Sequence, residues 1–483
     1  MARDEPEREA DGELDLLIDG VTAILGGAGD EQYRIAPETR IGVRDGSIVS
    51  IASTADPVPQ AKRLVDARGL LALPGMISTH NHVFQNLIKG IGDELEVWPI
   101  VEGVILATGE EMTPEETYLA SLAACVEGLK SGRTALLDFM VGRPEIEQHR
   151  SVLRAFRESG VRGWFGRATR ELHHEGGHRD PWYIPLEEAL DQISQLATEY
   201  DNGLGVPSAL PAPGNPRTMT TEGLVRVAEY AREQGCLITS HLAEYDAERD
   251  EGIERWGTGT IAALESLGFL GPNVVAAHSV LVDEQEIEIL ARTGTKVSYN
   301  PVSNAYCGVG TAPVVRMLER GVDVSLATDG SSVNTQDLIQ SLKFGALLQK
   351  AATRDARAIN ARDMLRMATH AGAVSLGVPD DLGVLGVGRR ADFFLFDPLR
   401  LNVAPVHDPI SAVVYCGAPE NVRTVVVGGD IVIDDGRSTR VDEDALAREL
   451  QDRAVALARR TGTTRFVTGR RFTPYRSYER RPA

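Results

Sequence analysis

Histidine and carboxylate residues are spaced along this chain in a pattern that could hold a metal ion. His80 and His82 end an apolar run, and in a β-strand the side chains at i and i+2 point to the same face. Two imidazoles aimed at one point can give a first-row metal two nitrogen ligands. A lone His-x-His pair is more often incidental, so this interpretation depends on further ligands elsewhere in the chain.

Polar residues of the right kinds follow three later apolar runs. His241 and Glu244 follow one of them, His278 ends the next, and Asp329 follows the last. Catalytic groups of a parallel-strand barrel lie at the C-terminal ends of its strands, so these residues would meet the histidine pair at one rim. His278 or Asp329 alone could be a satisfied polar core residue, but their joint placement favours a functional site.

The residues need a scaffold, and apolar runs alternate with helical patterns through the centre of the chain. The eight runs cover residues 71–79, 134–140, 161–168, 204–211, 236–242, 273–279, 295–300 and 322–328. Eight strands alternating with helices over about 300 residues are typical of a (β/α)8 TIM barrel, an α/β fold. A doubly wound sheet is the alternative, and eight sequential units favour closure into a barrel.

Local signals mark several helices between these runs. Thr113 to Glu116 predicts an N-cap, a proline at the first helical position and a capping box. Asp283 and Glu286 repeat the capping pattern, and Gly294 predicts the end of that helix.

Both chain ends consist of short alternating runs with turn signals such as Asp45-Gly46. We therefore expect one small β-sandwich domain built from both ends. The expected division is a disordered leader at 1–13, sandwich residues 14–71, the barrel at 72–378, sandwich residues 379–440, and a C-terminal helix and basic tail at 441–483.

The composition narrows the class of protein. A net charge of -20 argues against a nucleic-acid partner, because phosphate binding needs a basic surface. No apolar run approaches the length of a membrane span, and the charged N-terminus lacks the apolar core of a signal peptide. Four scattered cysteines without CxxC spacing argue against a cysteine zinc site and fit a reducing, cytoplasmic location.

Together these motifs resemble the metal-dependent amidohydrolase superfamily. Within it, the chain resembles the cytosine, adenosine and guanine deaminases and the s-triazine hydrolases such as atrazine chlorohydrolase and melamine deaminase. The motifs are His80-Asn81-His82-Val83-Phe84-Gln85, His241-Leu242-Ala243-Glu244, Pro301-Val302-Ser303-Asn304-Ala305-Tyr306, Thr328-Asp329-Gly330 and Arg389-Arg390-Ala391-Asp392.

The resemblance implies four ligands for a divalent metal: His80, His82, His241 and Asp329. Binuclear members of the superfamily use a carboxylated lysine on the fourth strand. This chain has no lysine between Lys130 and Lys296, so a single metal ion is implied. Zinc is the first choice and iron the alternative, because three histidines and one aspartate discriminate weakly between them.

The resemblance also implies a hydrolytic deaminase that releases ammonia from an N-heteroaromatic amine, such as an aminopurine, aminopyrimidine or aminotriazine. Glu244 would move a proton between the attacking water and the heterocycle. His278 would polarise or protonate the group at the attacked carbon. Asp329 would double as a metal ligand and as the first proton acceptor.

The substrate pocket has four candidate residues: Gln85, Trp98, Asn304 and Tyr306. Loop packing is the alternative role of Trp98 and Tyr306. Three histidines of another loop, His173, His174 and His178, match no ligand template and indicate a lid or plain surface more than a metal site.

Other activities stay open at this stage. The run Gly330 to Asn334 departs from the dechlorinating triazine hydrolases, which have Asn directly after the metal aspartate and a polar residue where Val333 stands. Deamination is therefore favoured over dechlorination, while loss of an N-alkylamine remains an alternative. A cyclic-amide hydrolase of the imidazolone type and a non-catalytic scaffold are further alternatives, and a free base and a nucleoside are equally open as substrates. A homodimer or larger homo-oligomer is expected from the family's habit.

Overall fold

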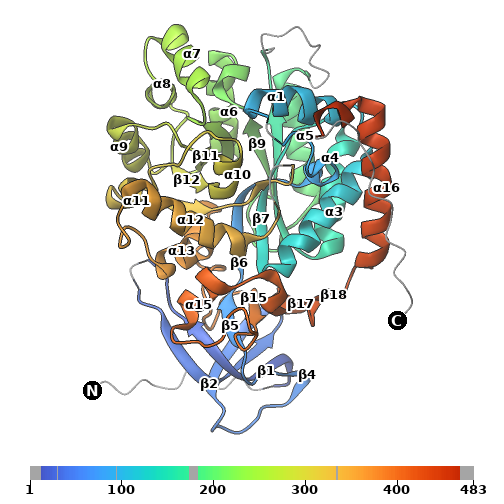
Figure 1. The fold of residues 1–483 in the computed structure, drawn as a ribbon, viewed down its shortest axis with the longest axis vertical. Coiled ribbons are helices and arrows are strands. Elements are labelled where there is room, and N and C mark those ends of the chain that lie inside the picture. Colours follow the sequence, from blue (N-terminus) through green and yellow to red (C-terminus); the bar gives the residue numbers. More distant parts are fainter. Residues whose placement is uncertain (1–11, 30, 94, 173–182, 333–334, 468–483) are drawn as a thin grey trace.

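Parallel strands alternate with helices through the centre of the chain, and strands from both chain ends form a separate sheet (Figure 1). The computed structural model describes residues 12–29, 31–93, 95–172, 183–332 and 335–467. Several sequence predictions lie outside this range: most of the leader, most of the basic tail, the side chain of Trp98, the run Val333-Asn334, and His173, His174 and His178.

The parallel strands form two sheets. One has the order β14 (Asp329–Gly330), β6 (Met76–His82), β7 (Arg133–Met140), β8 (Arg162–Thr169) and β9 (Ala209–Pro213). The other has the order β10 (Ile238–Leu242), β11 (Val274–His278), β12 (Lys296–Tyr299) and β13 (Val324–Leu326). Nearly all of these strand residues are buried, which fits the continuous apolar runs, because helices cover parallel strands on their outer face.

The first predicted strand is divided in two. Its first half is β5 (Leu71–Pro74), which joins the sheet formed by the chain ends, and its second half is β6. Gly75 lies between them, where a Cβ would stand 2.2 Å from the side-chain oxygen of Thr134. The chain thus passes from one sheet to the other at Gly75, and any larger residue there would require the side chain of Thr134 or the backbone to move. The fourth strand also begins later than predicted, at Ala209.

Nine strands from the two chain ends form one mixed sheet. Its order is β18 (Arg437–Ser438), β17 (Asp430–Asp434), β16 (Val422–Val427), β15 (Phe393–Phe396), β5, β1 (Leu14–Leu25), β2 (Arg34–Arg44) and β3 (Ser47–Ser53), and β4 (Ala61–Asp66) pairs with β1. Buried apolar side chains from both ends, including Ile18 and Phe393, form a core of their own there. This sheet lies at the bottom of Figure 1.

The helices pack outside the parallel strands. Those of the central region are α3 (Pro114–Lys130), α4 (Ile146–Ser159), α5 (Leu186–Glu199), α6 (Thr221–Gln234), α7 (Asp246–Trp256), α8 (Thr260–Ser266), α9 (Glu284–Thr293), α10 (Pro301–Tyr306), α11 (Val314–Glu319), α12 (Leu338–Thr353), α13 (Ala361–Ala368) and α14 (His370–Ser375). The capping boxes of α3 and α9 are confirmed, as is the left-handed glycine that ends α9.

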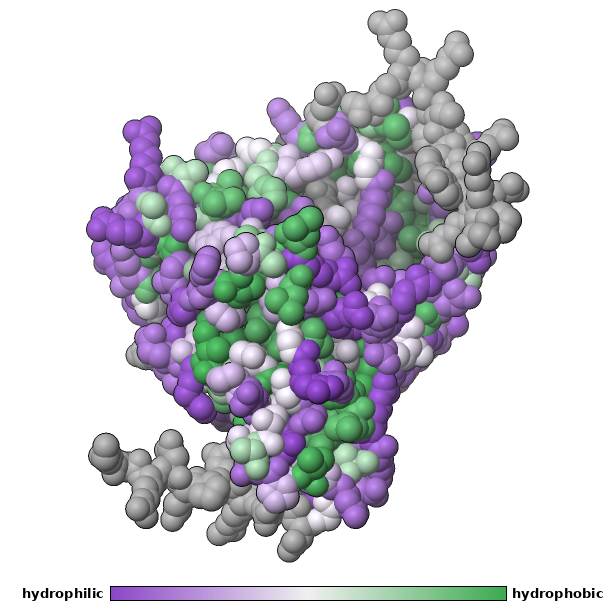
Figure 2. Space-filling view, turned by 60° about the horizontal axis from the view of Figure 1, so that its bottom comes forward, coloured by the Kyte–Doolittle hydropathy of each residue, from purple (hydrophilic) through white to green (hydrophobic). Residues whose placement is uncertain are grey.

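Two further helices follow near the C-terminus, α15 (Pro409–Cys416) and α16 (Glu443–Thr461). The helix α16 runs alongside α3 at the edge of the molecule (Figure 1). Hydrophilic residues cover much of the face in Figure 2, with hydrophobic residues gathered between them. Within the described residues, none of the helices combines the length and apolar character needed to cross a bilayer.

Candidate metal centre and active site

Three histidines from two strand ends converge at the carboxyl edge of the parallel strands. His80 and His82 lie at the end of β6, and His241 lies in β10. One nitrogen of each ring lies within 4.8 Å of the others. The two rings of β6 and the ring of His241 belong to different sheets, and the fold brings the three imidazoles together at the strand ends.

Asp329 completes this cluster from β14. Its Oδ1 lies 3.3 Å from Nε2 of His80 and 3.4 Å from Nε2 of His82. The residue has a φ of 65°, a left-handed conformation that is uncommon outside glycine and that recurs at functional sites. His278 in β11 also has a positive φ, 72°, so two of these residues sit in strained turns directly at strand ends.

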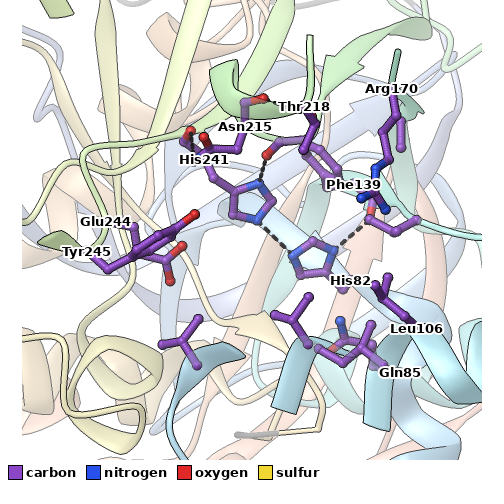
Figure 3. Close-up of a pocket in the computed structure, with 16 residues that line it drawn as sticks. His82, Gln85, Leu106, Phe139, Arg170, Asn215, Thr218, His241, Glu244 and Tyr245 are labelled. Carbon is purple, nitrogen blue, oxygen red and sulfur yellow. Dashed lines mark hydrogen bonds between the residues drawn. The ribbon is translucent and has the colours of Figure 1, made fainter. Parts of the chain in front are cut away.

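The ring nitrogens of this cluster are arranged to ligate a cation. Nδ1 of His82 lies 2.7 Å from the carbonyl of Phe139, and Nδ1 of His241 lies 2.7 Å from the carbonyl of Gly214. Each Nδ1–H therefore donates to a carbonyl, which leaves the Nε2 lone pairs facing each other at 3.3 Å (Figure 3). Neither nitrogen of the fully buried His80 has a hydrogen-bond partner.

Burial keeps these imidazoles neutral. It lowers the pKa of His82 to about 3 and that of His241 well below its usual range. For Asp329, burial alone would raise the pKa, but the adjacent imidazoles, those of His80 and His278 among them, hold it well below the usual range. Three neutral nitrogens and one carboxylate in a buried site are a donor set that fits a divalent transition metal.

Glu244 and His278 lie together beside this cluster. Nδ1 of His278 is 3.7 Å from Oε1 of Glu244, and its Nε2 is 3.9 Å from Oδ2 of Asp329. Burial raises the pKa of Glu244. Burial alone would lower the pKa of His278, but the two carboxylates outweigh it and raise the pKa. A carboxyl and an imidazole with raised pKa values are suited to proton transfer near neutral pH.

Amide side chains from α10 and its N-terminus orient His278. Oδ1 of Asn304 lies 2.8 Å from Nδ1 of His278 and accepts a hydrogen bond from its N–H, and the side chain of Asn300 lies 3.2 Å from the same nitrogen. This arrangement keeps Nε2 directed towards Asp329 and the cavity. Ser303 donates from its hydroxyl to Oδ2 of Asp329 at 2.5 Å, so the same short helix also supports that carboxylate.

The buried carboxylate of Glu248 anchors the loop that carries Glu244. It accepts hydrogen bonds from the backbone N–H of Ala243 at 2.7 Å and of Glu244 at 3.3 Å, and from the side chain of Asn215 at 3.0 Å. Ala243 has a φ of 51°, so this anchor holds a left-handed turn at the end of β10. The turn is what lets Glu244 face the cavity three residues after His241.

A buried polar network ties the ends of β6 and β14 together. Oδ1 of Asn81 accepts from Arg133 at 2.8 Å and from the hydroxyl of Thr328 at 2.9 Å. Arg133 also donates to Oε1 of Gln336 at 2.6 Å, and Gln336 in turn donates to the backbone carbonyl of Asp329 at 3.0 Å. The separation between the histidine pair and Asp329 is therefore fixed by direct hydrogen bonds.

Comparison with known proteins shows the family of this chain. The amidohydrolase family pattern matches residues 71–432. A 5'-deoxyadenosine deaminase of Methanosarcina mazei is 34% identical over 424 residues, which cover 87% of this chain and 94% of that protein. The chain belongs to the amidohydrolase family.

Two further family members are similar over most of their length. A 5-methylthioadenosine/S-adenosylhomocysteine deaminase of Syntrophobacter fumaroxidans is 32% identical over 447 residues, 92% of this chain and 97% of that protein. The zinc complex of atrazine chlorohydrolase from Arthrobacter aurescens TC1 aligns with a TM-score of 0.83 at 25% identity, covering 92% of this chain and 99% of that one.

A cavity lies beside His82 and His241. Arg170, Asn215 and Tyr245 contribute polar groups to its walls, and Figure 3 shows Glu244 and Tyr245 on one side of the two histidines and Arg170 on the other. An apolar wall is formed by Val97, Val101, Ile105 and Leu106. A second hollow shares part of this lining and reaches His278 and Asp329.

The residues expected to bind substrate lie in different places. Gln85 lines both hollows, and its Oε1 accepts from the hydroxyl of Ser332 at 2.7 Å. Asn304 is buried behind His278. Tyr306 is 38% exposed, and its hydroxyl lies 3.4 Å from Asp93. As far as the described residues form them, neither hollow is lined by Asn304 or Tyr306.

Several site residues escaped the sequence analysis. Glu248 lies one helical turn after Glu244, and Asn215 directly precedes a proline at the start of a short helix. Both signals could have been noticed, because a carboxylate at that spacing and an Asn-Pro step mark structured loops. Arg170 and Tyr245 carry no such signal, since their spacing is that of ordinary loop residues.

Proposed function

We propose that this protein is a metal-dependent hydrolytic deaminase that replaces the exocyclic amino group of a heteroaromatic ring by oxygen and releases ammonia. The observation that carries the proposal is the convergence of three neutral imidazoles and a carboxylate with Glu244 and His278 on the same cavity. The named deaminases among its relatives support the same reaction class.

The ligands of one divalent metal are His80, His82, His241 and Asp329. The partnerless nitrogens of His80 and the facing lone pairs of the other two rings support this assignment. The fourth parallel strand, β9, carries no lysine that could bridge a second ion. Zinc is the preferred metal and iron the alternative. When bound, the metal lowers the pKa of water to about 7 and thus supplies a nucleophile at neutral pH.

The protein's own residues carry the protons. Glu244 takes a proton from the attacking water and delivers it to the ring nitrogen beside the attacked carbon, for which its raised pKa is suited. His278 holds a proton at Nε2 towards the oxygen that forms on that carbon, while Asn304 fixes its orientation from the far side. Asp329 accepts the second proton of the attacking water and passes it to the amino group, which leaves as ammonia.

The substrate is an adenosine-type nucleoside with an apolar 5' substituent. The relatives named for 5'-deoxyadenosine and 5-methylthioadenosine support the purine nucleoside. The wall of Val97, Val101 and Ile105 supports an apolar group on the part of the substrate that extends from the metal. Ammonia is the leaving group in this proposal, and adding atrazine, which carries both chloride and alkylamino groups, to the panel below tests the two alternatives.

The fold that carries this site is proposed to be a closed (β/α)8 barrel with a β-sandwich. The step from β13 to β14 supports closure, because β14 pairs with the first barrel strand, β6. We propose the domain division expected from the sequence, with 72–378 as the barrel and 14–71 plus 379–440 as the sandwich. The homo-oligomer and the cytoplasmic location stay predictions, which sedimentation and cell fractionation test.

The proposal is tested with zinc-loaded protein and a panel of amines: 5'-deoxyadenosine, 5'-methylthioadenosine, S-adenosylhomocysteine, adenosine, adenine and melamine. We expect ammonia and the corresponding 6-oxopurine nucleoside, with the 5'-deoxy and 5'-thioether compounds preferred. His241→Ala is the control that removes a ligand. Stoichiometric zinc without ammonia from any amine would refute the proposal. A cyclic amide of the imidazolone type is assayed in parallel, and a ring-opened product from it would support the imidazolone-type hydrolase instead.

A further inference from the structure

The apolar wall of the cavity comes from one short segment of unusual conformation. Val97 lies in α1 (Val97–Ile100), and Val101 and Ile105 lie in a π-helix, η2 (Val101–Leu106). These three residues are four positions apart, so they present one face to the cavity. A π-helix is rare and is found frequently at functional sites, and here it lines the cavity beside His82 and His241.

The back of this segment is covered by the C-terminal part of the chain. A Cβ placed on Gly103 would lie 2.8 Å from Cζ of Phe466, which belongs to the short helix η5 (Thr463–Phe466). The backbone N–H of Gly92, just before the segment, donates to the carbonyl of Phe466 at 3.2 Å. The ring thus lies directly on the backbone of η2, and a methyl group at position 103 would force the ring or the segment to shift.

Phe466 is itself held in place by the preceding helix. Near the end of α16, Arg460 donates to the carbonyl of Glu111 at 2.8 Å and to the buried carboxylate of Glu116 at 2.9 Å. At the start of α16, Glu443 pairs with Lys130 at the end of α3. Since α16 is tied to α3 at both ends, it is a rigid base for the ring (Figure 1).

We infer that the contact between Phe466 and Gly103 sets the position of the apolar wall and thereby the room for the substrate's apolar substituent. Both are positioning residues, since neither lines the described cavity and both act through Val101 and Ile105. The inference rests on the proposed function, because it treats this cavity as the substrate pocket. An apolar pocket discriminates steeply by size, so a small displacement of the wall changes which substituent fits.

The contact predicts a specific pattern of coupling between two substitutions. Gly103→Ala pushes the segment off the ring and into the cavity, because the new methyl group overlaps Phe466. We expect KM for 5'-methylthioadenosine to rise about tenfold, the effect of a methylene-sized change in an apolar pocket, while kcat and zinc content stay as in the wild type. Phe466→Ala removes the obstacle, so Gly103→Ala in that background should raise KM no further.

The control is Phe344→Ala, which removes a 41% exposed phenylalanine of α12 remote from both hollows and should leave KM unchanged. Phe466→Leu keeps an apolar contact and should stay close to the wild type. Additive effects of the two substitutions, or a loss of kcat without a change in KM, would overturn the inference. If Gly103→Ala proves insoluble, restored solubility in the double variant supports the contact, and continued insolubility counts against it. If the wild-type protein releases no ammonia, the proposed function is refuted. If it does, non-additive effects of Gly103→Ala and Phe466→Ala on KM support the inference and additive effects refute it.

Discussion

Replacing Glu248 tests whether the loop of Glu244 is held by a buried carboxylate. Glu248→Ala removes the acceptor of three hydrogen bonds, from the backbone of Ala243 and Glu244 and from the side chain of Asn215. Each buried donor left without a partner costs about 1–3 kcal/mol. Burial raises the pKa of Glu248 to about 7, so the variant also loses an unfavourable buried charge. The three donors together cost about 6 kcal/mol, and removal of the group with the raised pKa returns about 3 kcal/mol at pH 7. We therefore expect the free energy of unfolding to fall by about 3 kcal/mol in total.

The same change should slow the reaction, because Ala243 would leave its left-handed turn and Glu244 would move from its place beside His278. A displacement of about 1 Å in a catalytic group costs roughly 10²-fold in rate, so kcat for ammonia release should fall by about that factor. Urea unfolding of the zinc-loaded protein and steady-state ammonia release measure the two effects.

The matched control is Glu254→Ala, which removes a glutamate from the exposed side of the same helix. An exposed change of this kind stays within about 0.5 kcal/mol. If Glu248→Ala keeps kcat within about twofold of this control, a loss far below the roughly 10²-fold expected, Glu248 does not position Glu244 and the reasoning fails. Loss of stability with unchanged kcat would assign Glu248 a purely structural role.

Three further outcomes follow from the site. Removal of the metal with a chelator should abolish ammonia release, and added zinc should restore it. Metal analysis should find one ion per wild-type chain and roughly a tenth of that or less in His80→Ala, and two ions per wild-type chain would contradict the single-metal proposal. Asn304→Ala should lower kcat by about 10- to 100-fold, the cost of a lost hydrogen bond to a charged group, with KM unchanged; a change in KM alone would return Asn304 to the substrate pocket. Burial raises the pKa of the Asp138 carboxyl to about 7 from the usual 3.8, so the folded state binds the carboxyl proton more tightly than the unfolded chain does, and the free energy of unfolding falls as the pH rises to 7. The free energy of unfolding of Asp138→Asn should therefore rise relative to that of the wild type by about 1.4 kcal/mol per pH unit between pH 5 and 7. A difference in urea unfolding that stays constant over this pH range would contradict the prediction.

The clustering of the proposed metal ligands could be predicted from the sequence because strand periodicity places them. His80 and His82 share a face by their spacing, and the ends of parallel strands meet at one edge, so His241 and Asp329 had to lie near them. The capping boxes of α3 and α9 followed from local hydrogen bonding alone. What local patterns missed was the change of sheet at Gly75, because the apolar run continues across it and only the contact with Thr134 marks the break.

The pocket walls could not be predicted for the same physical reason. Val101 and Ile105 have the composition and spacing of any buried helix, and nothing local indicates that a π-helix turns them towards the cavity. The support behind them comes from Phe466 at the other end of the chain, through a contact that only folding creates. A cluster of candidate ligands built from strand ends can thus be predicted from the sequence, whereas substrate selection that depends on distant packing partners cannot. For this protein, the reaction class is therefore better determined by the sequence than the identity of the substrate, and the proposed coupling between Gly103 and Phe466 is where that identity can be tested.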